Sequence, residues 1–136
     1  MSALDAAIPI GRLAALTGVK VTTIRYYERE GLLREPPRTA SDRRCYGPGD
    51  VRRLTFIRRA RELGFETADV RALLDLSDQS ERPCEEADLI AQRRLEAVND
   101  KIALLVRLRD ELGRMLEHGQ HGRVADCRVI EALSDR

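Results

Sequence analysis

This 136-residue chain contains three cysteines, whose thiols could stay free, bind metal or take part in redox chemistry. Cys45, Cys84 and Cys127 are odd in number and far apart in the sequence, which argues against a disulfide framework and indicates a reducing compartment. Cys45 lies among arginines, which favour its thiolate, although a tolerated small residue on a loop is the simpler explanation. Cys84 and Cys127 enclose a long segment without proline, so their chemistry depends on what that segment positions.

The segment 85–117 is predicted to form one amphipathic helix. It contains no proline, and its only glycine is Gly113. Apolar residues follow a three- and four-residue spacing, at Leu95, Val98, Ile102, Leu105, Leu112 and Leu116, which is interrupted once, at Arg109. A helix of this length spans about 50 Å, so within one chain it keeps Cys84 and Cys127 far apart.

The apolar stripe of 85–117 needs a partner, because nothing C-terminal to it is long enough to cover it. We therefore expect a coiled-coil dimer. If the two helices run antiparallel, Cys84 of one subunit lies beside the 119–127 loop of its partner. Two thiolates from different chains would then clamp a soft metal ion at the dimer interface. From the residues alone, the alternative that Cys84 and Cys127 have no role in metal binding stays open.

Charge is divided unevenly along the chain, although the formal net charge is only +1. Residues 1–61 hold 13 Lys and Arg against 6 Asp and Glu, a net charge of +7. Residues 62–136 hold 11 against 17, a net charge of −6. The basic half would attract a polyanion and the acidic half would repel one.

A helix-turn-helix pattern opens the basic half. Short helices are predicted at 10–16 and 21–30, with a break at 17–19 and a C-terminal Gly31. The second helix directs hydroxyl, guanidinium and phenol groups outward, on Thr22, Thr23, Arg25 and Tyr26. Such groups contact bases and phosphates when a helix enters a major groove. Tyr27 fits a core position as well as an exposed one.

Residues 32–47 are predicted to form a small hairpin, or wing, because two adjacent prolines exclude a helix interior. Its basic residues are Arg34, Arg38, Arg43 and Arg44. A second helix pair follows, opening at Pro48, with Thr67 as the N-cap of 68–76. A polar connector then leads to the long helix, and a loop and a short terminal helix follow it.

Four of these segments resemble the MerR-type transcription regulators. They are 24–33 (IRYYEREGLL), 10–14 (IGRLA), 44–46 (RCY) and 56–65 (FIRRARELGF). The resemblance covers essentially the whole chain, and the combination of motifs is highly specific. It implies a mainly α fold, in which a winged helix-turn-helix DNA-binding domain precedes a long antiparallel coiled-coil dimerisation helix and a short C-terminal metal-binding loop. The expected divisions are 1–76, 77–84, 85–118 and 119–136.

The resemblance also implies how such a protein acts. A homodimer binds a palindromic stretch of double-stranded promoter DNA and distorts it, so that RNA polymerase reads an over-long spacer. Arg25 and Tyr26 would contact DNA from the recognition helix, Arg44 and Tyr46 from the wing, and Arg58 from the second helix pair. The full set of candidate DNA-binding residues is Thr22, Thr23, Arg25, Tyr26, Arg43, Arg44, Tyr46 and Arg58.

Metal-responsive members of that family place one cysteine just before the long helix and others in a loop after it. Cys84 and Cys127 match this arrangement, but Gly119 stands near the position where such loops usually begin with another cysteine. His118 or His121 would complete a mixed sulfur and nitrogen site suited to zinc. Alternatively two thiolates suffice for a linear ion, or the site is impaired. The expected ligand is a divalent thiophilic ion: zinc, cadmium, lead or mercury.

Other functions find less support in the sequence. No phosphate-binding loop, paired His/Glu metal motif or nucleophile elbow is present, so an enzyme is not expected. A redox- or small-molecule-responsive regulator of the same architecture is the alternative. No apolar run is long enough for a membrane span, and the start of the chain does not resemble a signal peptide, so we expect a cytoplasmic protein.

Overall fold

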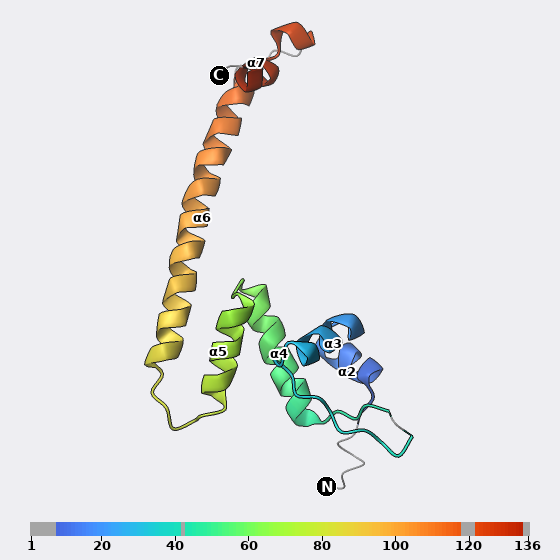
Figure 1. Ribbon diagram of the computed structural model, residues 1–136. Coiled ribbons are helices and arrows are strands. Elements are labelled where there is room, and N and C mark those ends of the chain that lie inside the picture. Colours follow the sequence, from blue (N-terminus) through green and yellow to red (C-terminus); the bar gives the residue numbers. More distant parts are fainter. Residues whose placement is uncertain (1–7, 42, 118–121, 135–136) are drawn as a thin grey trace. The chain divides into compact units, whose positions relative to one another are not determined.

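The computed structural model of the protein describes residues 8–41, 43–117 and 122–134. Over these residues it consists of six α-helices, one 3-10 helix and no named strand (Figure 1). The prediction of a mainly α fold is confirmed. The chain divides into two units, residues 1–90 and residues 91–136, with the boundary inside the longest helix.

Helices α2 (Ile10–Thr17) and α3 (Val21–Arg29) form the helix-turn-helix. The turn between them depends on Gly18, whose φ of 73° lies in the left-handed region that residues with a Cβ rarely adopt. Its N–H donates to the carbonyl of Ala14 at 2.9 Å, and the hydroxyl of Thr17 donates to the preceding turn. These bonds satisfy carbonyls at the end of α2 and fix the direction in which α3 leaves.

Helix α4 (Pro48–Glu62) begins as its sequence predicts. Pro48 occupies the first turn, where the missing N–H costs nothing. The buried carboxylate of Asp50 accepts the N–H of Gly47 at 2.9 Å, which satisfies a backbone donor at the helix start. The guanidinium of Arg34 lies 3.7 Å from the same carboxylate and links the start of the wing to α4.

Helix α5 (Thr67–Ser77) follows α4 after a tight turn at Gly64. The prediction that Thr67 is the N-cap is wrong by one residue. The N–H of Val70 bonds to the carbonyl of Glu66 at 2.9 Å, so Glu66 is the cap and Thr67 is already helical. The second helix pair is otherwise as predicted.

The first unit buries two hydrophobic clusters. One lies under the helix-turn-helix and contains Leu13, Val19, Ile24, Leu33, Tyr46 and Leu54. The other joins the second helix pair to the chain after α3 and contains Leu32, Ile57, Ala60, Val70 and Leu74. Tyr27 packs against both clusters, which answers the question left open for it. Leu16 repeats the three-residue spacing of Ile10 and Leu13 along α2, but its side chain is 53% exposed.

The wing, residues 32–47, is a hairpin held by isolated bridges rather than by named strands. Arg38 pairs with Arg44 and Ile8 pairs with Tyr46, both in antiparallel fashion. The Ile8–Tyr46 pair exchanges two backbone hydrogen bonds of 2.8 and 2.9 Å. The base of the wing is therefore tied to the chain just before α2.

Helix α6 (Glu85–Glu117) contains 33 residues without a break, as predicted. Its part in the second unit leaves a row of large apolar side chains exposed: Leu95, Ile102, Leu105, Val106, Leu112 and Leu116. Leu104 and Leu108 are also exposed, but they lie on other sides of the helix. The 3-10 helix η1 (Val124–Asp126) and helix α7 (Arg128–Ser134) follow. Met115 of α6 and Ala132 of α7 line a shared hollow, so α7 lies against the end of α6 (Figure 1). In the described ranges no helix has the length and apolarity that a membrane span requires.

Candidate nucleic-acid interface and metal-binding cysteines

The recognition helix α3 is anchored on one side and free on the other. Ile24 is fully buried and fixes the inward face. Thr22 and Arg25 are exposed, Thr23 is half-buried, and Tyr26 is 43% exposed. The predicted outward face of α3 therefore lies where a ligand can reach it.

A basic hollow of about 610 Å³ lies where α2, α3 and the wing meet. Its lining residues are Pro9, Ile10, Arg25, Arg38, Arg43 and Arg44. We call the four arginines of this set the arginine cradle. The N-terminus of α2 also opens here, and helix N-termini attract anions. This concentration of positive charge suits a phosphate backbone.

Sequence reasoning placed Arg38 on the wing but left it out of the candidate DNA-binding residues. The antiparallel bridge between Arg38 and Arg44 brings it into the cradle. Thr39 supports the bend, since its N–H donates to the carbonyl of Arg43 at 2.7 Å. The spacing of Arg38 and Arg44 on either side of a predicted turn is compatible with this pairing, but it does not by itself identify the pair.

Removal of the Arg38 side chain should weaken DNA binding and should also make the binding constant less dependent on salt concentration. Each phosphate contact contributes about 0.9 to the slope of log K against log salt concentration, so Arg38→Ala should lower that slope by about 1 per subunit. Fluorescence anisotropy of labelled duplex DNA over a salt series measures it. Arg107→Ala, which removes the same charge from the exposed surface of α6, is the control and should leave the slope unchanged. An unchanged slope for Arg38→Ala would exclude a phosphate contact.

Tyr46 is 1% exposed, and its hydroxyl donates to Oε1 of Glu28 on α3. Burial, followed by the hydrogen bond and the charge of Glu28, raises the pKa of Tyr46 above its ordinary value. Nη1 of Arg44 lies 3.4 Å from Oε2 of the same carboxylate. The structure thus places Tyr46 in the core, packed beneath the candidate DNA-binding residues of α3, whereas the resemblance implies a direct contact with DNA.

Glu28 is a residue that sequence reasoning missed. It lies one turn after the buried Ile24, on the inward side of α3, and its side chain is only 6% exposed. A carboxylate on the buried face of a helix requires a partner, because an unpaired buried charge is costly. The position of Glu28 on the inward face of α3 was therefore visible in the sequence, although it did not show which residues pair with the carboxylate.

Arg58, the candidate from the second helix pair, is half-buried on α4. Its Nη1 lies 2.9 Å from Glu62 one turn later. Its Nε is buried and has no hydrogen-bond partner within the described part of the chain. Arg58 lies outside the residues that line the arginine cradle.

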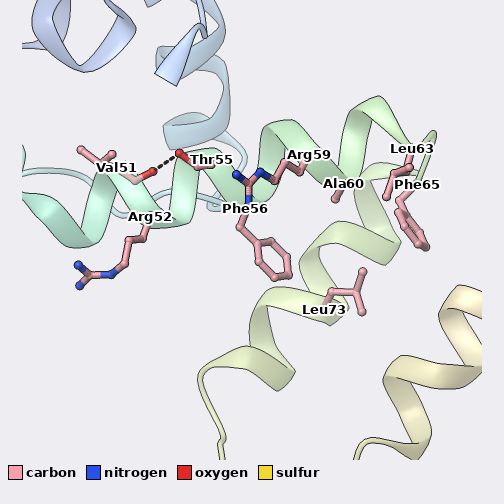
Figure 2. Close-up of a pocket in the computed structure, with 9 residues that line it drawn as sticks. All are labelled: Val51, Arg52, Thr55, Phe56, Arg59, Ala60, Leu63, Phe65 and Leu73. Atoms are coloured by element: carbon pink, nitrogen blue, oxygen red, sulfur yellow. Dashed lines mark hydrogen bonds between the residues drawn. The ribbon is translucent and has the colours of Figure 1, made fainter. Parts of the chain in front are cut away.

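An apolar hollow of about 520 Å³ lies on helices α4 and α5 (Figure 2). Its lining residues are Val51, Arg52, Thr55, Phe56, Arg59, Ala60, Leu63, Phe65 and Leu73. The hydroxyl of Thr55 is occupied, since it donates to the carbonyl of Val51 at 2.7 Å. Sequence patterns did not predict this hollow, because the residues that form it come from α4, from the turn after it and from α5.

The two cysteines of the predicted metal site belong to different units of the chain. Cys84 is exposed directly before α6, and its Sγ lies 3.7 Å from Oδ1 of Asp88, one turn into the helix. Cys127 is half-buried between η1 and α7, and its carbonyl accepts the N–H of Glu131 at 2.9 Å. Both thiols are free. The predicted ligands His118 and His121 lie outside the described residues.

Among the residues described, no group of three or more His, Cys, Asp or Glu side chains could hold a metal ion within one chain. The donors that are present still fit a thiophilic ion. Two accessible thiols supply soft ligands, and Asp88 supplies an oxygen beside one of them. Additional donors would have to come from a second subunit or from outside these ranges.

Comparison with known proteins identifies the family. Two family models match, "MerR HTH family regulatory protein" over residues 8–77 and "MerR, DNA binding" over residues 51–115. The mercuric resistance operon regulatory protein of Shigella flexneri is 39% identical over 93% of this chain and 87% of its own length. The regulator ZntR of Escherichia coli K12 is 37% identical over 91% of this chain and 90% of its own length.

Two solved structures share the fold at similar identity. PbrR691 from Ralstonia metallidurans CH34, in complex with lead(II), has a TM-score of 0.80 and 31% identity, covering 93% of this chain and 99% of that one. MerR from Bacillus megaterium MB1, in complex with mercury(II), has a TM-score of 0.71 and 32% identity, covering 94% and 100%. The fold and the family define a helix-turn-helix, DNA-binding regulator of transcription and not an enzyme. The chain belongs to the MerR family.

Proposed function

We propose that this chain is a metal-sensing transcription regulator that acts as a homodimer. The observation that carries the proposal is the placement of two free thiols, Cys84 directly before α6 and Cys127 ten residues beyond its last residue, Glu117. One relative is named a mercuric resistance operon regulatory protein, and two related structures are solved with lead(II) or mercury(II) bound. This supports a thiophilic ion as the signal.

The DNA-binding part of the proposal rests on the first unit. Arg25, Arg43 and Arg44 would grip phosphates from the arginine cradle, joined by Arg38. Thr22, Thr23 and Tyr26 would face the major groove from α3. A more distant contact would come from Arg58. Tyr46 would act indirectly, through the residues that its hydroxyl and ring support.

The dimer would form along α6. Its exposed apolar row is the kind of surface that a coiled coil covers, and the two copies would run antiparallel. Cys84 of one subunit would then share an ion with Cys127 of the other, and His118 or His121 would be further donors. The ion would lock the two subunits in one arrangement. We propose that this arrangement distorts the bound promoter so that RNA polymerase can use it.

A second candidate function is favoured by the apolar hollow on α4 and α5. A cavity of about 520 Å³ is large enough for a small apolar molecule, which would act as the effector of a regulator of the same architecture. The need for the thiols of Cys84 and Cys127 separates the two candidate functions. A small apolar effector would change transcription even when both thiols are removed, whereas a metal ion would not.

Metal stoichiometry tests the proposal. Reduced protein is dialysed against zinc, cadmium, lead or mercury(II) at limiting concentration, and bound metal is measured per dimer. Cys127→Ser should lose the tightly bound ion, with affinity lower by about 100-fold or more, because a ligand atom is removed. Cys45→Ser, which removes a thiol from the wing, should bind as the wild type does. Equal binding by both variants would refute the site.

A further inference from the structure

We propose that Glu28 is a positioning residue for DNA recognition, which holds the wing in register with the recognition helix and so sets the preference for specific over non-specific DNA. Glu28 belongs to α3, whereas its two partners, Arg44 and Tyr46, belong to the wing. No contact between Glu28 and DNA is required. The inference rests on the DNA-binding part of the proposed function and is independent of the metal.

The geometry uses both oxygens of the carboxylate. Oε1 accepts the hydroxyl of Tyr46, and Oε2 faces Nη1 of Arg44 at 3.4 Å. The side chain of Glu28 is 6% exposed, and Tyr46 is 1% exposed. Because a buried carboxylate is stable only when its partners are in place, this pair of contacts strongly favours one position of the wing.

That position fixes part of the arginine cradle. Arg44 keeps 26% of its side chain exposed, so it is tethered by Glu28 and still reaches the hollow. Arg25 lines the same hollow from α3, one turn before Glu28. A single carboxylate therefore couples a cation on the wing to a cation on the recognition helix. Groups that are already ordered lose less entropy when they bind.

The sign of the charge separates this role from simple attraction. Glu28 places a negative group beneath a surface that otherwise collects arginines, which weakens its pull on any phosphate backbone. A residue selected for general affinity would be neutral or basic here. A residue that sets geometry improves only those complexes in which the wing and α3 must fit one site together.

The test compares Glu28→Gln with Glu30→Gln. Glutamine keeps the size of Glu28 and an acceptor for Tyr46 but loses the charge that holds Arg44. Glu30 is exposed at the end of the same helix, so its variant is matched in charge and location. The probes are a duplex selected from a random pool by the wild-type protein and a scrambled duplex of equal length and composition. Enrichment of one duplex from the pool by the wild-type protein tests DNA recognition itself, separately from the role of Glu28.

Glu28→Gln should bind the selected duplex on the order of tenfold more weakly and the scrambled duplex equally or more tightly. Glu30→Gln should change both affinities by the same factor. In a double-mutant cycle, Arg44→Ala should cost less in the Glu28→Gln background than in the wild type. Thermal unfolding of each variant reports whether the fold is intact.

Three results would overturn the proposal. They are an unchanged ratio of specific to non-specific affinity in Glu28→Gln, an equal ratio change in Glu30→Gln, and additive effects in the cycle with Arg44→Ala. If Glu28 had only a structural role, Glu28→Gln would lower the unfolding temperature and leave the ratio of specific to non-specific affinity unchanged. The double-mutant cycle of Glu28→Gln and Arg44→Ala still tests the proposal if one variant is less stable, because it measures the coupling between the two residues.

Discussion

Cys84→Ser is expected to abolish the transcriptional response to metal while leaving DNA binding intact. A serine hydroxyl has nearly the volume of a thiol but binds thiophilic ions far more weakly, so metal affinity should fall by about 100-fold or more. Cys84 is exposed and belongs to neither buried cluster, so the fold should be unaffected. Transcription in vitro from a promoter carrying the selected duplex, measured over a metal titration, checks it.

The matched control is Cys45→Ser, which makes the same replacement within the wing. It should respond to metal as the wild type does. Binding of both variants to the selected duplex without metal should equal that of the wild type. If Cys84→Ser still raises transcription at the wild-type metal concentration, the proposed sensor is wrong.

Leu105→Glu should convert the protein to a monomer and reduce its affinity for the selected duplex by about 100-fold or more, because the two half-sites would no longer be bound together. Leu105 lies in the exposed apolar row of α6 and is 58% exposed in the single chain. Two glutamates facing a coiled-coil seam would repel each other and bury charge. Sedimentation equilibrium measures the mass, and anisotropy measures the affinity.

Ala103→Glu is the control for this change. Ala103 is exposed on α6 two residues earlier, outside the predicted seam, and the variant adds the same charge. It should remain dimeric and bind DNA with wild-type affinity. A dimeric Leu105→Glu protein would show that another surface joins the subunits.

Much of the fold could be predicted from local sequence patterns. The bounds of α6 follow from an apolar period interrupted only at Arg109 and from the absence of proline between Glu85 and Glu117. Gly18 and Gly31, both at positive φ, mark the ends of α2 and α3. These features depend on residues close to one another in the chain, which is why the sequence predicts them.

Features that depend on distant residues were not predictable in the same way. Tyr46 and Glu28 are 18 positions apart, and only folding shows that the tyrosine is buried against α3 rather than free to touch DNA. Leu16 fits the apolar period of α2 but lies past the edge of the buried cluster. The cradle position of Arg38 likewise required the antiparallel bridge to Arg44.

The central claim is that the two cysteines act between subunits, and mixed dimers test it. In one mixed dimer, Cys84→Ser is on one chain and Cys127→Ser on the other. If the ion is shared between subunits, this dimer keeps one complete pair of thiols. In the second mixed dimer, both substitutions are on one chain and the other chain is wild type. Sharing between subunits leaves that dimer with no complete pair.

Tightly bound metal per purified mixed dimer is the measurement. We predict half of the wild-type stoichiometry when the two substitutions are on different chains, and none when they are on the same chain. The reverse pattern would mean that each chain binds its ion alone, and it would contradict a sensor built across the dimer interface.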